Sequence, residues 1–175
     1  MHNSIALNLI ASYILAMPRH PTPSDSSPEQ WLALDRQLCF ALYSASLAMT
    51  KAYKPLLEPL GLTYPQYLVM LVLWEGDGLT VSQLGERLTL DSGTLTPLLK
   101  RLEALGLVQR LRDAADERRV LLQLTPAGRR LKARAVAVPQ GIAAAVGCNL
   151  DDIGALSQRL RQLREQLSDS KPRAA

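Results

Sequence analysis

The sequence predicts a mainly α-helical fold with one small β-wing, in which a helix-turn-helix is followed by a hairpin. Three observations support this prediction. The 175 residues are 47% hydrophobic and rich in Leu and Ala with a single Phe, a composition that favours helices. Two short helix-like segments joined by a tight turn lie in the middle of the chain, and two strand-like segments follow them. At this length the chain forms about one domain with its own core.

The first of the two short helices is predicted to end at Leu88. Thr80 or Ser82 can serve as its N-cap, because a short side-chain oxygen accepts a hydrogen bond from a free backbone N–H. Apolar residues recur at helical spacing between cap and end. The pattern then breaks, and Asp91 or Ser92 supplies a second N-cap. This spacing predicts a tight turn between two helices.

The second helix has an apolar stripe and a polar outer face. The stripe follows offsets of three and four residues and consists of Leu95, Leu98, Leu99, Leu102 and Leu105. The outer face consists of Thr94, Thr96, Lys100 and Arg101. Pro97 removes one backbone donor near the first turn, so we expect the helix to start late or to bend. Gly106 is predicted to end it.

Residues 107–112 and 119–124 have the pattern of two strands, and residues 113–118 form a charged tip between them. A charged tip is most often a solvated loop. Its position directly after a basic helix favours a wing instead, because an arginine at the tip of a wing can enter the narrow, negative minor groove of DNA.

Positive charge is concentrated around this hairpin. From Lys100 to Arg134 there are ten Lys and Arg against four Asp and Glu, a surplus of +6, whereas the whole chain carries only +4. A localised basic stripe is typical of nucleic-acid binding. In a helix-turn-helix the early polar residues of the second helix meet base edges and its basic residues meet phosphates. The pattern therefore predicts a DNA-binding transcriptional regulator.

Longer helices are predicted on both sides of this module. One opens near Trp31 and runs to about Leu57 with a broad apolar band, which suits packing against its own domain and against a symmetry mate. After Gly61 a helix begins at Tyr64, followed by Pro65, and runs to a glycine-rich turn.

The C-terminal part is predicted to form two more helices. The first begins at Thr125 as cap and runs to about Val146, kinked by Pro139 and Gly141. The last, from residue 150 to 167, is amphipathic. We therefore divide the chain into an extension at 1–30, dimerisation helices at 31–62 and 125–168, a winged helix-turn-helix at 63–124 and a tail at 169–175.

Several other classes of protein are not supported by the sequence. Two cysteines do not match a zinc spacing, so we expect no metal site and no cofactor. No run of 18 or more apolar residues occurs, so we expect no membrane span and a cytoplasmic location. Residues 5–17 are apolar but lack the basic flank of a signal peptide, and they are expected to be a loose extension or a helix packed on a partner.

Several segments together resemble the MarR family of winged-helix repressors. They are LTYPQYLVMLVLWE, LTLDSGTLTPLLKRLEALGLVQR and DERRVLLQLTPAG, and the resemblance covers about residues 34–167. The early cysteine in LCFALYSAS and the tyrosines resemble the organic hydroperoxide-sensing (OhrR-like) branch more narrowly. The resemblance implies a homodimer that binds a palindromic double-stranded operator and is induced by an organic hydroperoxide.

The same resemblance assigns roles to cysteines and tyrosines. It implies that Cys39 reacts with peroxide and that Cys148 of the other subunit then forms a disulfide with it. Tyr53 and Tyr64 correspond to the tyrosines that hydrogen-bond the sulfur, and Tyr43 lies close by in sequence. Phenol donors favour the thiolate, the nucleophilic form. Apolar neighbours favour alkyl or lipid hydroperoxides over hydrogen peroxide, and we expect this selectivity.

Helix geometry limits which tyrosine reaches Cys39. Tyr53 is fourteen residues further along one predicted helix, so it lies about 21 Å away along the axis. If Tyr53 contacts Cys39, it comes from the partner subunit. Only Tyr43, at the i+4 position, is within local reach.

For DNA, the family pattern points to the recognition helix and the wing. Its residues here are Ser92, Thr94, Thr96 and Lys100 on the helix, Arg118 at the wing tip with Asp116 supporting it, and Arg101 and Arg112 toward phosphates.

Three rival functions remain open from the sequence. The first is a MarR-type repressor that binds a small aromatic ligand in the dimer cleft, with incidental cysteines. The second is a thiol peroxidase, which the absence of a Cys-x-x-Cys motif and of a thioredoxin-like pattern disfavours. The third is membrane attachment through residues 5–17.

Overall fold

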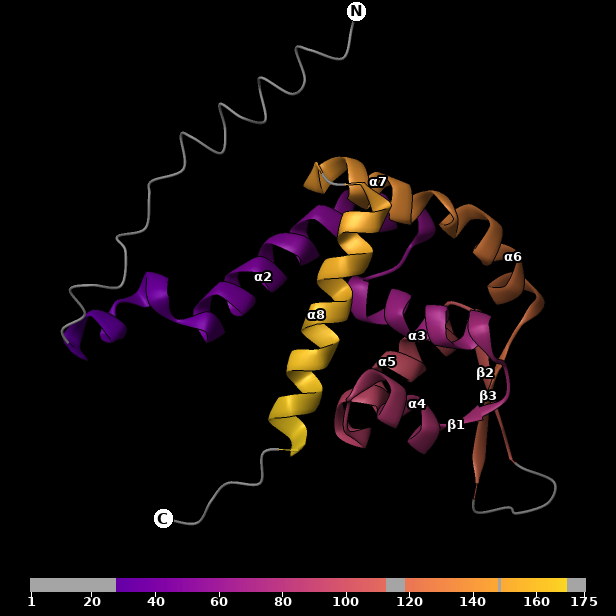
Figure 1. Ribbon diagram of the computed structural model, residues 1–175. Helices are drawn as coiled ribbons and strands as arrows, with labels where there is room; N and C mark the ends of the chain where they lie inside the picture. Colours follow the sequence, from indigo (N-terminus) through magenta and orange to yellow (C-terminus); the bar gives the residue numbers. More distant parts are fainter. Residues whose placement is uncertain (1–27, 113–118, 148, 170–175) are drawn as a thin grey trace, which may run out of the picture. The chain divides into compact units, whose positions relative to one another are not determined.

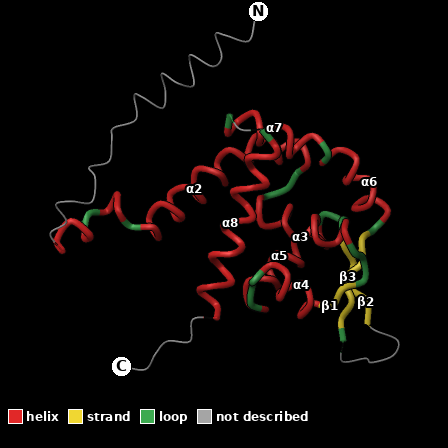
Figure 2. The backbone as a smooth tube through the Cα atoms, viewed as in Figure 1, coloured by secondary structure: helices red, strands yellow, loops and turns green. Residues whose placement is uncertain are grey.

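The computed structural model describes residues 28–112, 119–147 and 149–169 (Figure 1). The chain divides into two compact units, one up to Ala45 and one from Ser46 onward. The second unit holds most of the helices and a three-stranded antiparallel sheet (Figure 2). The predicted fold class, mainly α with a small β-wing, is confirmed.

The first long helix is shorter than predicted. Two 3₁₀ segments, η2 (Pro28–Leu32) and η3 (Leu34–Arg36), precede α2 (Leu38–Leu57). The continuous helix expected from Trp31 is therefore wrong over its first turns, because Gln37 has an extended backbone with φ −82° and ψ 112°. The side-chain amide Nε2 of Gln37 donates to the carbonyl of Trp31.

The end of α2 follows the prediction. A 3₁₀ turn, η4 (Glu58–Leu60), continues it, and Gly61 then takes a left-handed conformation with φ +68°. Glycine adopts this conformation without steric cost. Helix α3 (Tyr64–Glu75) has Thr63 as its N-cap, and Thr63 forms a capping box with Gln66.

Helices α4 (Val81–Leu88) and α5 (Ser92–Ala104) form the predicted helix-turn-helix. Thr80 caps the first and Asp91 caps the second, which settles the two alternatives that the sequence left open. The late start expected because of Pro97 is wrong: α5 begins at Ser92 and includes Pro97 in its second turn. Gly106 follows the helix with φ +67°, as expected for a terminating glycine.

The sheet has one strand more than predicted. Strands β2 (Val108–Arg112) and β3 (Val120–Leu124) form the expected hairpin, and β1 (Leu79–Thr80) pairs antiparallel with the other edge of β3. The strand order is β1-β3-β2 (Figure 2). With two residues, β1 is too short to show the alternation by which strands are recognised in a sequence.

The core of the second unit is built from the apolar faces of these elements. The apolar stripe of α5 supplies Leu95, Leu99 and Leu102, each at most 1% exposed. Leu105 is an exception to the predicted stripe, since α5 ends at Ala104 and the Leu105 side chain is 49% exposed. Burial of the stripe leaves the opposite face of α5 exposed.

The C-terminal part forms α6 (Pro126–Ala135), α7 (Ala137–Val146) and α8 (Leu150–Asp169). The single helix expected to run from Thr125 to about Val146 is divided at Val136 into α6 and α7, although Val136 itself keeps helical dihedral angles of φ −57° and ψ −29°. Pro139 explains this position, because its ring has no N–H for the carbonyl of Ala135 and crowds it. Among the described helices none is alone long and apolar enough to cross a membrane, and only the bent pair 38–60 and 64–75 passes by length and composition.

Candidate nucleic-acid interface and redox site

The start of the recognition helix α5 is fixed by its cap. Asp91 Oδ1 accepts from the backbone N–H of Thr94 at 2.9 Å, and Asp91 Oδ2 accepts from the Thr94 hydroxyl at 3.0 Å. Two hydrogen bonds hold the pKa of Asp91 below its ordinary value. The larger effect comes from the Thr94 backbone N–H and the smaller from the Thr94 hydroxyl. Asp91 therefore stays ionised at the positive end of the α5 dipole.

The predicted base-reading and phosphate residues of α5 all lie on its exposed face. They are Ser92, Thr94, Thr96, Lys100 and Arg101. The Thr96 hydroxyl donates to the carbonyl of Ser92 at 2.7 Å, so both threonine hydroxyls are engaged as donors within the helix and their oxygens remain acceptors. Lys100 and Arg101 form no hydrogen bond or ion pair with the described residues. Both are thus available as cations on this surface.

The two arginines of β2 differ in environment. Arg110 Nε donates to Glu103 Oε2 at 2.7 Å, which ties the wing to the end of α5. Arg112 is exposed at the end of β2 and has no such partner among the described residues. Asp116 and Arg118, predicted at the wing tip, lie outside the described residues.

Part of the basic stripe serves the fold. Arg129 of α6 pairs with Asp77 at 2.7 Å, Lys132 donates to the carbonyl of Trp74 at 2.9 Å, and Arg134 donates to that of Pro59. The charge count in the sequence does not distinguish these cations from the exposed ones on α5. Arg129, Lys132 and Arg134 are therefore poorer candidates for DNA contacts than Lys100 and Arg101.

Cys39 is the second residue of α2, and its side chain is exposed. It forms no disulfide within the described part of the chain. Tyr43 lies one helical turn later, and its i+4 spacing places it on the same face of α2 as Cys39. Its side chain is 61% exposed. Cys148 lies outside the described residues.

Tyr53 and Tyr64, predicted together from the resemblance, are in contact. Their ring centroids lie 4.6 Å apart, with Tyr53 on α2 and Tyr64 at the start of α3. Tyr67 joins them, 6.0 Å from Tyr53, and is 3% exposed. Sequence reasoning did not single out Tyr67, although its i+3 spacing from Tyr64 on one helix was a usable signal.

Burial raises the pKa of each of these three phenols. For Tyr53 the neighbouring Tyr64 and Tyr67 add to the effect of burial. The phenols therefore stay protonated at neutral pH and remain hydrogen-bond donors. A donor pair of this kind suits a sulfur anion or a peroxide oxygen.

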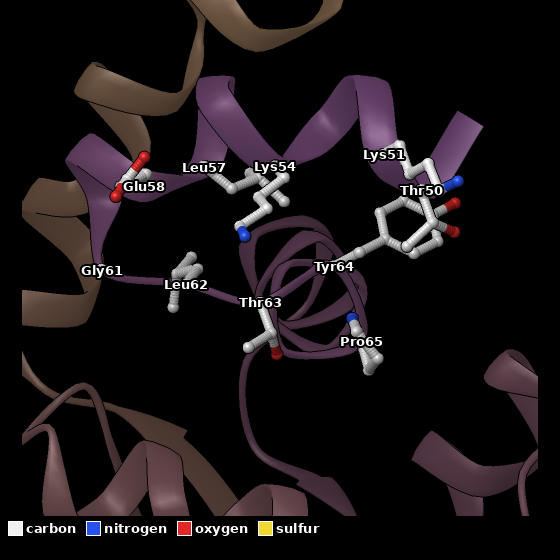
Figure 3. A pocket seen from close by; sticks show the side chains of 10 residues that line it. All are labelled: Thr50, Lys51, Lys54, Leu57, Glu58, Gly61, Leu62, Thr63, Tyr64 and Pro65. Atoms are coloured by element: carbon white, nitrogen blue, oxygen red, sulfur yellow. The ribbon is translucent and has the colours of Figure 1, made fainter. Parts of the chain in front are cut away.

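A cavity of about 530 Å³ opens beside this cluster (Figure 3). It lies between the second half of α2 and the start of α3, with Leu57, Leu62 and Pro65 on its apolar side. The Tyr64 ring points toward Thr50, and Lys54 reaches into the space between the two helices (Figure 3). The volume of this cavity is in the range of small-molecule binding sites.

Two relatives cover most of this chain. The organic hydroperoxide resistance transcriptional regulator of Bacillus subtilis is 51% identical over 136 residues, 78% of this chain and 92% of that protein. The HTH-type transcriptional regulator TtmR of Methylorubrum extorquens is 50% identical over 150 residues, 86% of this chain and 77% of that protein. The chain belongs to the organic hydroperoxide regulator branch of the MarR family.

Two further comparisons agree with this membership. The family model described as transcriptional regulator SarA/Rot matches residues 51–135 of this MarR-family chain. Reduced AbfR bound to DNA is 35% identical, with a TM-score of 0.66, and the match covers 82% of this chain and 100% of AbfR. AbfR, from Staphylococcus epidermidis, was also solved in a disulfide form, 38% identical with a TM-score of 0.55 over 78% of this chain and 96% of AbfR. This MarR-family protein is a DNA-binding transcriptional regulator with a winged-helix fold.

Proposed function

We propose that this regulator is a repressor that senses organic hydroperoxides through Cys39. The observation that carries the proposal is the 51% identity to a regulator of organic hydroperoxide resistance, over 92% of that protein. The paired phenols of Tyr53 and Tyr64 and the exposed thiol of Cys39 support it. A protein in this role acts in the cytoplasm, where its operator is.

The chemistry proposed at Cys39 has two steps, oxidation to a sulfenic acid and then formation of a disulfide. The thiolate attacks one peroxide oxygen, an S–O bond forms, the O–O bond breaks, and the alcohol leaves after taking a proton. Cys39 is then a sulfenic acid. The thiol of the partner subunit's Cys148 displaces its oxygen as water, and an intersubunit disulfide forms.

The partner subunit is proposed to complete the sensor site. Cys39 and Tyr53 lie near opposite ends of α2, so the rise of a helix separates them by about 21 Å within one chain. A Tyr53–Tyr64 pair that acts on Cys39 therefore acts on the partner's Cys39, whereas Tyr43 acts within its own helix. The apolar lining beside these tyrosines favours alkyl or lipid hydroperoxides over hydrogen peroxide.

DNA binding is proposed to use the exposed face of α5 and the wing of each subunit. Ser92, Thr94 and Thr96 meet base edges, whereas Lys100, Arg101 and Arg112 meet phosphates. Arg118, held by Asp116, reads the minor groove from the wing tip. In a homodimer two such surfaces are related by a two-fold axis, so the operator is palindromic.

Operator release in the presence of oxidant tests the proposal. Cumene hydroperoxide is added to the reduced protein on a labelled operator, and fluorescence anisotropy follows the complex. We expect affinity to fall on the order of 10-fold or more, within the usual range of allosteric coupling, and dithiothreitol to restore it. Cys39→Ser should remain bound throughout. Cys148→Ser should form no disulfide-linked dimer on a non-reducing gel and should release much less of the operator than the wild type. A Cys39→Ser protein that still releases DNA contradicts the proposal.

A second candidate is the response to a small aromatic ligand, and the cavity beside Tyr64 favours it. Its volume accommodates a benzoate-sized molecule, and the ammonium groups of Lys51 and Lys54 suit an anion. A variant without cysteines, Cys39→Ser with Cys148→Ser, separates the two functions. Release of the operator from this variant by salicylate supports the ligand-responsive repressor. If hydroperoxide releases the operator from the wild type but not from this variant, the result supports the redox sensor.

A further inference from the structure

One acidic side chain joins three elements at the base of the wing. Asp77 lies in the turn between α3 and β1, and its Oδ1 accepts from the backbone N–H of Leu124 at 2.8 Å and of Gly78 at 3.0 Å. Its Oδ2 pairs with Arg129 Nη1 at 2.7 Å. Because Leu124 ends β3 and Arg129 lies near the start of α6, the carboxylate connects the turn, the wing and the helix that follows it.

Two further hydrogen bonds join α3 to α6 at the same place. Trp74 Nε1 donates to the carbonyl of Gly128 at 2.9 Å, and Lys132 Nζ donates to the carbonyl of Trp74 at 2.9 Å. Gly128 is packed so closely that a Cβ there would lie 2.1 Å from the carbonyl oxygen of Leu107. The start of α6 is thus held from the α3 side and from the β2 side.

The turn that contains Asp77 also positions the helix-turn-helix. Gly78 donates to the carbonyl of Leu122 at 3.0 Å, and the next two residues form β1 against β3. Thr80, the last residue of β1, is the N-cap of α4. The orientation of α4 and the orientation of the wing therefore depend on the same short turn.

The Asp77–Arg129 pair is better suited to orientation than to stability. The Arg129 side chain is 59% exposed and that of Asp77 is 26% exposed. Ion pairs as exposed as this contribute about 0–1 kcal/mol to folding. The Asp77 carboxylate is also fixed to the end of β3 by the Leu124 N–H, so its pair with Arg129 restricts the angle between α6 and the wing, and a misplaced wing loses its DNA contacts.

We propose that Asp77 is a positioning residue for operator binding, which through Arg129 sets the angle between α6 and the wing. This inference rests on the proposed function, in which α5 and the wing read the operator. Asp77 makes no DNA contact in this account, and its effect on affinity passes through the wing.

The test compares two substitutions that remove the same charge. Asp77→Asn keeps an acceptor for Leu124 and Gly78 but loses the ion pair with Arg129. Glu75→Gln, two residues earlier, removes a carboxylate that pairs only with Arg87 among the described residues, and it serves as the matched control. We expect Asp77→Asn to lower operator affinity about 10-fold while affinity for unrelated DNA stays within about 2-fold, a change in specificity that partial unfolding does not produce. Glu75→Gln should stay within about 2-fold of the wild type on both DNAs.

Variants of Arg129 separate positioning from a direct phosphate contact. Arg129→Met leaves both backbone hydrogen bonds of Asp77 intact, and Arg129→Lys keeps the charge. We expect Arg129→Met to match Asp77→Asn, the double variant to be no weaker than either, and Arg129→Lys to recover most of the affinity. Additive losses, or an Asp77→Asn protein that binds like Glu75→Gln, overturn the inference. Release of the operator from the wild type on addition of hydroperoxide is measured in the same series. A failure of the sensor proposal is therefore seen separately from a failure of this inference.

Discussion

At the scale of single residues, Asp91 links the stability of the recognition helix to pH. Its folded-state pKa is lowered from 3.8, first by the backbone hydrogen bond from Thr94. A lowered pKa stabilises the fold above the unfolded value, and this contribution is lost as the pH falls through the folded value. We expect Asp91→Asn to lose less unfolding free energy than the wild type between about pH 6 and about pH 3, because Asn caps a helix without titrating.

Urea unfolding at the two pH values measures this difference. All other carboxyl groups titrate in both proteins, so the difference between the two losses isolates Asp91. Equal losses in the two proteins would show that the cap carries no linkage to pH.

Residue-level predictions succeeded where a local rule decides. Asp91 and Thr80 were foreseen as possible caps because short polar side chains before an apolar periodic segment have that use. Asp77 was not foreseen, since its partners Leu124 and Arg129 lie 47 and 52 positions later in the chain. Nothing in the local sequence distinguishes such a carboxylate from an ordinary turn residue. The roles proposed for Cys39 and Cys148 remain predictions.

At the scale of elements, α5 and the wing are proposed to act as one DNA-binding surface. The bond from Arg110 to Glu103 joins them, and Arg112 is left exposed. We expect Arg112→Ala to weaken binding of all DNA sequences similarly and to reduce the slope of log affinity against log salt by about 1, as for the loss of one phosphate contact. Anisotropy titrations over a range of salt concentrations measure that slope.

A control arginine on α8 is available for this titration. Arg161 is exposed and lies outside the proposed DNA interface, so Arg161→Ala should leave the slope of log affinity against log salt unchanged. If both variants change the slope equally, the effect reflects net charge, and Arg112 is not a phosphate contact.

Element boundaries were predictable where the chain itself stops a helix. Gly61, Gly106 and Pro139 each end or interrupt a helix close to the expected position. The start of α2 was not predictable, because no proline or glycine lies between Trp31 and Leu38 to mark it. Strand β1 exists through its pairing with β3, a long-range contact that its two residues do not encode alone.

At the scale of the whole molecule, apolar side chains remain exposed on the helices outside the winged core. On α8 they are Leu156, Leu160 and Leu167, at 59%, 42% and 64% exposure. An exposed apolar stripe along one helix is typical of an interface, and a second copy of the chain is the proposed partner. We expect Leu160→Glu to shift the protein from a dimer toward the 19.2 kDa monomer and to weaken operator binding.

Analytical ultracentrifugation measures this shift. Gln162→Glu adds the same charge to an exposed polar position of α8 and should remain dimeric. A Leu160→Glu protein that sediments like the wild type would remove this stripe from the interface.

The central claim is that the oxidation state of Cys39 decides whether the operator is bound. The most direct measurement takes samples from one reaction with cumene hydroperoxide, reads the fraction of oxidised Cys39 by mass spectrometry and reads the fraction of bound operator by anisotropy. We expect the loss of bound operator to follow the oxidation of Cys39 throughout, with hydrogen peroxide slower in both readouts. Release that precedes the oxidation of Cys39, or complete oxidation with the operator still bound, would contradict the account.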